Sequence, residues 1–321
     1  MSLKPILIVT GEPNSIFLEI FFKTLKYKKI KSPIILIASQ KLLKLQMKVL
    51  KFKKKINLLD KNNLHYKLDN KTINLIDENY NTNKAFQKIS NNSKKYVENC
   101  FKIAVNLIKS GYSNRLINGP VSKKHFLKKK FPGITEYLAN KFNIKNIGML
   151  IYNKSLAVCP VTTHVPIKYV SKKINKKTIV QKINLINKFY KKNLNFEPKI
   201  AITGLNPHCE STDAFNEDSK ILIPIIKYMK KNHYKVYGPF PADTIFLKKN
   251  RKKYNVILGM YHDQVLTPLK TLYEYDAINL TLGLPFIRVS PDHGPNESML
   301  GKNLSNPLSL IQAINFLEKI K

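Results

Sequence analysis

Short apolar runs alternate with segments of helical pattern along the whole chain. Each run has the length of a buried strand, and the segments between them place apolar residues at about every third or fourth position, as helices do. The runs that predict strands span residues 6–10, 33–39, 115–118, 147–152, 156–161, 199–203, 256–261 and 278–282. This alternation predicts an α/β protein with a largely parallel sheet.

Helix signals separate these runs, and several carry residues that commonly cap helices. Asn14, Asp218 and Asn306 are the predicted N-caps, Asn306 with Pro307 behind it, and Gly111 is a predicted C-cap. The helices expected between the strands span residues 15–25, 85–109, 178–192, 219–231 and 307–320. Residues 51–83 have the weakest apolar pattern, which predicts a peripheral hairpin or an irregular excursion.

The composition favours a cytoplasmic protein. No apolar stretch approaches the roughly 20 residues of a membrane span, and the N-terminal run is too short for a secretory signal. Cys100, Cys159 and Cys209 show no CxxC spacing, so a reducing compartment is expected.

The net charge of +36 favours either of two interpretations. A nucleic-acid binder would carry such a charge. A chain rich in Lys, Asn and Ile with no Trp also fits an AT-rich coding bias, and its lysines are spread along the chain rather than gathered in one arm. We therefore expect a solvated surface without a specific nucleic-acid partner, one that attracts a phosphorylated anion.

Three histidines follow predicted strands. They are His164, His208 and His262, each in a polar turn, and Asp263 follows the last of them. Because ligand sites of open α/β sheets lie beyond the carboxyl ends of strands, the three could meet at one divalent ion. Imidazoles suit zinc, cobalt, nickel or iron. The alternative is that each histidine is a structural hydrogen-bonding residue.

Lys270, Asn279 and Arg288 form a second candidate set, since they are polar residues within otherwise apolar or turn-like sequence. The fork of Arg288 fits a phosphate or a carboxylate. A salt bridge with a local acid is the alternative at that position. Asp292 and His293 follow in a tight turn of the kind that is often structural.

No glycine-rich dinucleotide motif (GxGxxG), phosphate-binding loop, HExxH or GxSxG is present. Any NAD is therefore not held by the usual Rossmann glycines.

Several short segments, taken together, resemble the 4-hydroxythreonine-4-phosphate dehydrogenase family of pyridoxal phosphate synthesis. The resemblance covers almost the whole chain, and it rests on the order and spacing of segments that are each weak alone. These are residues 11–13 (GEP), 118–121 (NGPV), 133–136 (GITE), 163–166 (THVP), 204–208 (GLNPH), 241–244 (PADT), 261–264 (YHDQ), 279–288 (NLTLGLPFIR) and 292–294 (DHG).

The resemblance implies a fold like that of isocitrate and isopropylmalate dehydrogenases, with two α/β domains, mostly parallel sheets and a central cleft. We place the domains at residues 1–130 with 275–321, and at residues 131–274. A homodimer is implied, with the active site at the subunit interface and metal ligands contributed by both subunits. By position, His164, His208 and His262 would bind the metal, and Thr135, Lys270, Asn279 and Arg288 would contact a small phosphorylated substrate.

The implied reaction is oxidation of the secondary hydroxyl of 4-phosphohydroxy-L-threonine, followed by decarboxylation to 3-amino-2-oxopropyl phosphate. NAD, with NADP as the alternative, and one divalent metal per subunit (Zn, Mg or Co) are the expected cofactors. Lys270 is the candidate for proton transfer, and Asp263 is the second candidate catalytic residue, supporting the metal site. The sequence assigns no residues to NAD and does not fix the metal.

Departures from the family pattern keep rival functions open. The family has histidine where this chain has Ile134, a glycine-rich stretch where it has residues 209–213, and Thr-Ala where it has Pro295-Asn296. Asn14 and the residues after it also differ from the usual Ala-Gly-Ile-Gly. These changes motivate a paralogue that acts on a threonate or erythronate phosphate. A relative that binds metal without catalysis is the other alternative.

Overall fold

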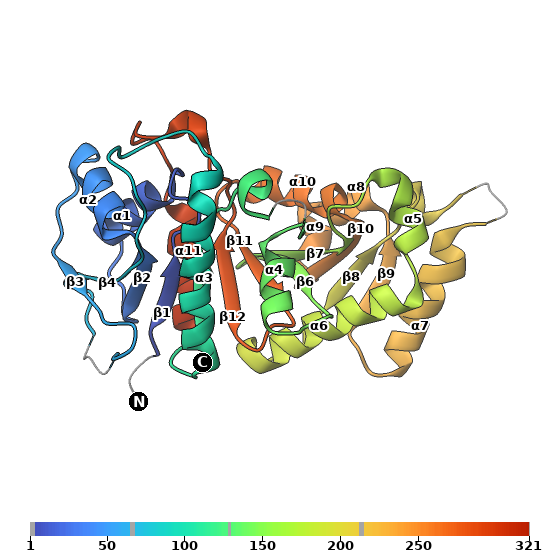
Figure 1. The fold of residues 1–321 in the computed structure, drawn as a ribbon. Helices are drawn as coiled ribbons and strands as arrows, with labels where there is room; N and C mark the ends of the chain where they lie inside the picture. Colours follow the sequence, from blue (N-terminus) through green and yellow to red (C-terminus); the bar gives the residue numbers. More distant parts are fainter. Residues whose placement is uncertain (1–3, 65–67, 128–129, 212–214, 321) are drawn as a thin grey trace. The chain divides into compact units, whose positions relative to one another are not determined.

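A computed structural model describes residues 4–64, 68–127, 130–211 and 215–320 of the chain (Figure 1). The backbone forms two compact units. The first unit consists of Met1–Asn143 with Leu284–Lys321, and the second unit of Ile144–Gly283. Of the departures noted above, Thr212 and Asp213 lie outside the described residues.

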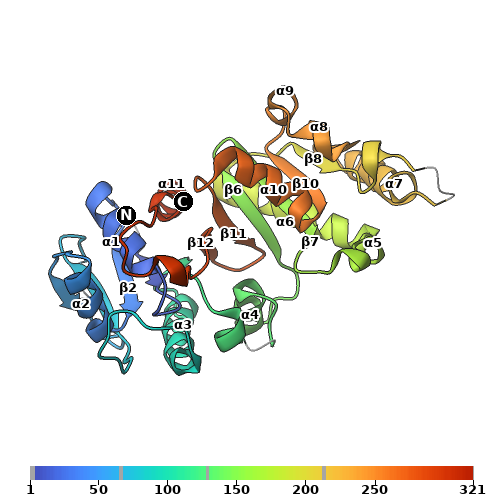
Figure 2. The same ribbon diagram turned by 90° about the horizontal axis from the view of Figure 1, so that it is seen from above.

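The first unit holds a parallel sheet in the order β3-β4-β2-β1-β5-β12. Its strands are β1 (Ile6–Val9), β2 (Ile34–Ala38), β3 (Ile56–Leu58), β4 (Ile73–Asp77), β5 (Arg115–Asn118) and β12 (Ile287–Pro291). Its helices are α1 (Phe17–Tyr27), α2 (Gln40–Val49), α3 (Lys94–Lys109), α4 (Ile134–Lys141) and α11 (Leu308–Lys319), with short turns η1 (Asn91–Ser93), η2 (Lys123–Leu127) and η6 (Glu297–Met299). Figure 2 shows α1 and α11 on one face of this sheet and α3 on the other. Since all neighbours are parallel, the carboxyl ends of β1, β5 and β12 lie at one edge.

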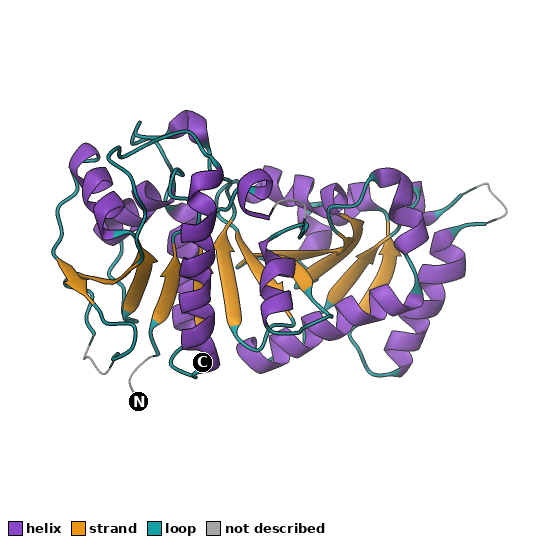
Figure 3. Cartoon of the chain, in the orientation of Figure 1, coloured by secondary structure: helices purple, strands orange, loops and turns teal. Residues whose placement is uncertain are grey.

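The second unit holds a mixed sheet in the order β11-β6-β7-β10-β8-β9. Its strands are β6 (Gly148–Asn153), β7 (Leu156–Thr162), β8 (Ile200–Thr203), β9 (Val236–Phe240), β10 (Val256–Tyr261) and β11 (Ile278–Leu282). Its helices are α5 (Val170–Lys173), α6 (Lys176–Leu194), α7 (Ile223–Lys231), α8 (Ala242–Ile245), α9 (Lys248–Arg251) and α10 (His262–Tyr273), with turns η3 (Ile167–Tyr169), η4 (Pro207–Cys209) and η5 (Asp218–Leu222). Strands β7, β10, β8 and β9 run parallel, and β6 is antiparallel to both β7 and β11. The predicted α/β class with mostly parallel strands is confirmed (Figure 3).

Both faces of the second sheet are covered, because neighbouring strand residues point to opposite sides. Val158 packs with Val265 and Leu269 of α10 in the main apolar cluster of this unit. Cys159, the next residue, lies near Tyr190 of α6, and burial raises the pKa of both groups, that of Cys159 to about 11. Helix α6 begins where Asn175 and Thr178 form reciprocal capping hydrogen bonds.

The observed division of the chain differs from the predicted boundaries after residues 130 and 274. Helix α4 groups with the first unit because the Tyr137 ring packs edge-on against Phe101 and Phe126, with centroid distances of 5.8 and 5.2 Å. Strand β11 groups with the second unit because it pairs along its whole length with β6.

Two local predictions were wrong. The segment 51–83 lies at the edge of the sheet as expected, but it contributes β3 and β4, which pair in parallel, so it is neither a hairpin nor wholly irregular. The helix expected over residues 85–109 begins only at Lys94, after a short turn at Asn91–Ser93 in which the Ser90 hydroxyl accepts the N–H of Asn92. None of the described helices combines the length and the apolar character that a membrane-spanning helix needs.

Candidate functional site

The three predicted metal ligands lie beyond the carboxyl ends of three adjacent parallel strands. In the order β7-β10-β8, Leu258 of β10 pairs with Cys159 of β7 and with Ile202 of β8. His164 follows the end of β7, His262 is the first residue of α10 after β10, and His208 follows β8 on turn η4. The local fold therefore carries all three histidines to the same edge of the second sheet.

His164 and His262 are brought together. Their ring centroids are 6.1 Å apart, with planes inclined by 33°. Nδ1 of His262 lies 2.6 Å from Oδ1 of Asp263. Because that contact engages Nδ1, Nε2 is the nitrogen left for another ligand, and a carboxylate behind the imidazole is usual for metal-binding histidines.

His208 does not join this pair. In the described part of the chain, no three His, Cys, Asp or Glu side chains are grouped so that they could hold a metal ion. The side chains of His164 and His208 are exposed, and both backbones are left-handed, with φ of 37° and 55°. Such conformations are costly for residues other than glycine, and they concentrate at functional sites.

The turn that carries His208 is held by a buried carboxylate. Asp218 accepts hydrogen bonds from the N–H groups of Leu205 and Asn206, at 2.8 and 3.0 Å, and from Nδ2 of Asn206 at 2.9 Å. Asp218 was predicted as a helix cap, but it begins the short turn η5 and points back to the loop after β8. Its place in Asn216-Glu217-Asp218, shortly after His208, is the sequence signal for this role.

Cys209 beside His208 is a neutral thiol at pH 7. Burial, and secondarily the nearby Asp218 carboxylate, raises its pKa to about 11. Gly204 leaves room for this side chain, since a Cβ there would lie 2.6 Å from Cys209 Sγ.

The side chain of Gln264 connects the ends of β8 and β10 by hydrogen bonds. Its Oε1 accepts from Thr203 Oγ1 at 2.8 Å and from the N–H of Met260 at 2.7 Å. Its Nε2 donates to the carbonyl of Gly204 at 2.7 Å. Thr162 of β7 adds a third tie, because its hydroxyl donates to the carbonyl of Met260 at 2.8 Å. Gln264 lies in the segment 261–264 (YHDQ), whose sequence does not predict this role.

Arg288 is the largest fully buried side chain of the first unit and is 1% exposed. Its Nε donates to Asn118 Oδ1 at 2.7 Å, and Nη1 contacts Thr135 Oγ1 at 3.5 Å. Burial lowers the pKa of Arg288 to about 10, and Glu136 acts in the opposite direction. The guanidinium therefore stays charged at pH 7. Oε2 of Glu136 is buried and lacks a hydrogen-bond partner within the described residues.

The four predicted substrate contacts are divided between the units. Thr135 and Arg288 are neighbours in the first unit, whereas Lys270 and Asn279 belong to the second. Lys270 lies in the last turn of α10 and is partly buried. Oδ1 of Asn279 on β11 is buried and has no hydrogen-bond partner in the described part of the structure.

The turn after β12 is tied into the first unit. His293 Nδ1 lies 2.9 Å from the carbonyl oxygen of Gly294, and its ring stacks near Phe17 at 6.5 Å. The N–H of Ile16 donates to the carbonyl of Pro295 at 3.1 Å.

A buried acid, Glu12, lies in the loop after β1. Its carboxylate accepts from the hydroxyl of Ser93 at 2.9 Å and from the N–H of Asn14 at 3.3 Å. Burial raises the pKa of Glu12, these two hydrogen bonds lower it, and Glu297 raises it further. The predicted cap Asn14 instead accepts the N–H of Gln87 at 3.0 Å, and the residue at the N-cap of α1 is Ile16, whose side chain makes no hydrogen bond.

Comparisons with known proteins point to one family. Residues 29–317 match the family model described as Pyridoxal phosphate biosynthetic protein PdxA. A curated 4-hydroxythreonine-4-phosphate dehydrogenase from Sulfurihydrogenibium sp. (strain YO3AOP1) is 35% identical over 326 residues, which cover 98% of this chain and 97% of the relative. A D-threonate 4-phosphate dehydrogenase from Pectobacterium atrosepticum is 34% identical over 218 residues, or 67% of each chain.

Solved structures support the fold. The crystal structure of 4-hydroxythreonine-4-phosphate dehydrogenase from Klebsiella pneumoniae is 26% identical, with a TM-score of 0.84 over 98% of both chains. An isocitrate dehydrogenase from Methylococcus capsulatus, 8% identical, has a TM-score of 0.50 over 97% of this chain and 84% of its own. This second likeness concerns the fold alone, and the predicted fold relationship is confirmed.

Proposed function

Because the chain belongs to the family of the pyridoxal phosphate biosynthetic protein PdxA, we propose that it oxidises 4-hydroxythreonine 4-phosphate in pyridoxal phosphate biosynthesis. The enzyme class follows from the relatives, which are named dehydrogenases, so the chain is an oxidoreductase. We propose NAD as the hydride acceptor, with NADP as the alternative, and the cytoplasm as the compartment.

The observation that carries the proposal is the delivery of three histidines to one sheet edge, two of them in ring contact. A lone histidine after a strand has many structural uses. Three such residues on adjacent parallel strands, with Asp263 behind one of them, are the donor set that a catalytic transition-metal ion uses.

The residues present fit a divalent metal ion in part. His164 and His262 are paired imidazole donors, and imidazole suits zinc and cobalt better than magnesium. His208 stands apart from them in the single chain. We propose that a homodimer completes the ligand set with a histidine from the second subunit, which leaves positions open for substrate.

The proposed chemistry removes a hydride and a proton from a secondary alcohol, and the resulting β-keto acid loses carbon dioxide. When bound, a divalent cation lowers the pKa of the substrate hydroxyl and offsets negative charge on its oxygen. In this proposal Asp263 fixes the orientation of His262. Lys270, which is partly buried in the last turn of α10, is the proposed residue for proton exchange with the substrate.

Arg288 and Thr135 are proposed to hold an anionic group of the substrate. The guanidinium is charged and buried, and its hydrogen bond to Asn118 holds it in one orientation. A phosphate or a carboxylate matches that fork. The buried Oδ1 of Asn279, which has no partner among the described residues, is the proposed acceptor for a hydroxyl or an amine of the substrate.

A sugar-acid phosphate, such as D-threonate 4-phosphate, is the second candidate substrate. The observation in its favour is Ile134, the first residue of α4, which replaces a family histidine with a side chain that makes no hydrogen bonds. The D-threonate relative matches a smaller share of the chain than the Sulfurihydrogenibium relative does.

The test is NADH production with 4-phosphohydroxythreonine, NAD and added divalent metal. Wild type should turn over, and His208→Ala should lose at least about a hundredfold in kcat if a ligand is removed. His233→Ala is the matched control, since His233 is also exposed and left-handed (φ 64°) but lies in the turn after α7. Turnover with threonate phosphate only would favour the second candidate, and no metal-dependent turnover with either would contradict the proposal.

A further inference from the structure

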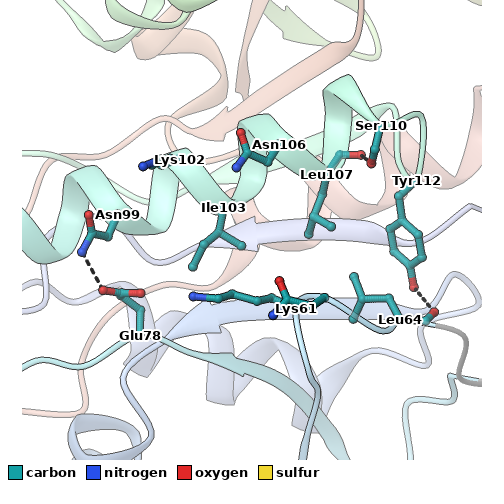
Figure 4. A pocket seen from close by; sticks show the side chains of 11 residues that line it. Lys61, Leu64, Glu78, Asn99, Lys102, Ile103, Asn106, Leu107, Ser110 and Tyr112 are labelled. Atoms are coloured by element: carbon teal, nitrogen blue, oxygen red, sulfur yellow. Dashed lines mark hydrogen bonds between the residues drawn. The ribbon is translucent and has the colours of Figure 1, made fainter.

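The first unit contains a cavity of about 680 Å³ beside α3, and no predicted site residue lines it (Figure 4). Its wall on the helix side is made by Asn99, Lys102, Ile103, Asn106 and Leu107. These residues recur three or four positions apart, so they form one stripe along α3. Lys61 lies across from the stripe, in the segment after β3.

Hydrogen bonds hold the two walls together at both ends of the cavity. At one end, Asn99 Nδ2 donates to Glu78 Oε1 at 2.7 Å, which ties α3 to the segment after β4. At the other end, the hydroxyl of Tyr112 donates to the carbonyl of Leu64 at 3.3 Å. Both contacts are visible in Figure 4. Hydrogen bonds of the fold itself therefore close both ends of the cavity, and the cavity opens between these two contacts.

The lining combines an apolar floor with a positively charged rim. Ile103 and Leu107 are buried and point into the cavity from α3. Lys61 and Lys102 are exposed ammonium groups at its edge. Glu78 is the acidic residue in the described lining of the cavity. The excess of positive charge favours an anion, and the two apolar side chains favour an aromatic group packed against them.

We propose that this cavity binds a small phosphorylated compound that carries a planar ring. Its volume lies within the range of about 300–1,000 Å³ that small-molecule sites occupy. The ring packs on Ile103 and Leu107, the phosphate lies between Lys61 and Lys102, and Asn106 bonds a ring heteroatom at the rim. A phosphorylated pyridine and a nucleoside monophosphate share this chemistry.

The two sources of that chemistry have different consequences. A phosphorylated pyridine is the product class of the biosynthesis after which the family is named, so its binding would let a later product act on this enzyme. That interpretation rests on the proposed function. The binding itself does not, and it is measured without any turnover.

The test is calorimetric titration of the full chain with pyridoxine 5'-phosphate, AMP and inorganic phosphate in turn. Pyridoxine 5'-phosphate has no aldehyde, so it does not form imines with the many lysines. We expect one of the two ring compounds to bind at least about tenfold more tightly than phosphate, because the floor adds apolar burial. Tighter binding of AMP assigns the cavity to a nucleotide, and tighter binding of pyridoxine 5'-phosphate to the product class.

Variants separate the cavity from the rest of the surface. Lys102→Glu reverses a rim charge and Asn106→Trp fills the opening, and each should raise the Kd about tenfold or more. Lys95→Glu is the matched control on α3, exposed and outside the cavity, and should change the Kd less than twofold.

Arg288→Lys tests whether the ring compound binds at the proposed substrate site instead of the cavity. This variant should leave the Kd of the ring compound unchanged. Equal weakening by Lys95→Glu, no effect of Lys102→Glu, or phosphate binding as tight as both ring compounds would each overturn the proposal. Turnover of 4-phosphohydroxythreonine is assayed separately, so an inactive enzyme with a working cavity, or the converse, is recognised.

Discussion

The guanidinium of Arg288 is fixed by an amide 170 positions earlier in the chain, because Nε donates to Oδ1 of Asn118 at 2.7 Å. The contact follows from the pairing of β12 with β5, in which Arg288 stands opposite Leu116. Asn118 then lies at the end of β5, where its side chain reaches the neighbouring strand. A buried cation is thereby held at the carboxyl edge of the first sheet.

Arg288→Lys should raise the KM for a phosphorylated substrate about 10–100-fold, because an ammonium replaces neither the fork nor the bond to Asn118. Steady-state kinetics of the purified variant measure this change. Arg115→Lys is the control, since Arg115 is also buried in the first unit but donates to the carbonyl of Ile320. It should lower stability and leave KM unchanged, and equal KM effects in both variants would contradict a substrate role for Arg288.

Asp263→Asn should weaken metal binding about 10–100-fold, since the carboxylate that orients His262 becomes a neutral amide. Competition with a chromophoric chelator measures the affinity directly. Asp276→Asn is a comparable change in the same unit at a residue with no part in the proposed site. An Asp263→Asn protein that holds zinc as tightly as wild type would show that this contact does not support a metal.

Asp218→Asn should lower the free energy of unfolding by about 2–4 kcal/mol, because the buried acceptor of two backbone N–H groups loses its charge. Chemical denaturation gives the value. Glu217→Gln removes charge from a neighbour that accepts from the side chain of Asn206, and should cost less than about 1 kcal/mol. We also expect metal affinity to fall in Asp218→Asn alone, since this carboxylate holds the turn of His208.

Glu12 should make the protein less stable as pH rises. Its folded pKa is raised above the unfolded value near 4.5 by burial, so the folded state holds the proton more tightly. The favourable contribution is fully present below pH 4.5 and is lost as pH rises through the folded pKa. Denaturation of wild type and Glu12→Gln between about pH 4 and 7 should show a flatter profile for the variant. The exposed Glu98, replaced by Gln, is the control and should leave the slope unchanged.

Strands with continuous apolar runs were predictable from sequence. Those at 115–118, 256–261 and 278–282 have the predicted bounds, because burial on both faces favours the adjacent apolar side chains at their centres. Strand β3 was not predicted, because Asn57 and Leu58 are exposed at the edge of the sheet and give no buried apolar run. Strand β9 was not predicted, because Gly238 and Pro239 interrupt its apolar pattern. Helix α10 was not predicted, because its first residues His262 and Asp263 were assigned to a polar turn after the strand and Pro268 lies inside the helix.

The candidate site was only partly predictable. Residue type and position after a strand identified the histidines, but strand order decides which turns are neighbours, and sequence does not give strand order. The contact between His164 and His262, and the separation of His208, therefore emerge only from the fold. The roles of Asp218 and Gln264 could not be assigned from sequence, because they depend on loops that pack in three dimensions.

Helix α10 carries a predicted metal ligand at its first residue, His262, and the predicted proton-transfer residue, Lys270, in its last turn. A helix rises about 1.5 Å per residue, so the two stand about 12 Å apart along one rod. Val265 and Leu269 press this rod against the sheet, while Pro268 lacks the N–H that would complete its hydrogen bonding. Any shift of α10 along its axis would therefore move His262 and Lys270 together.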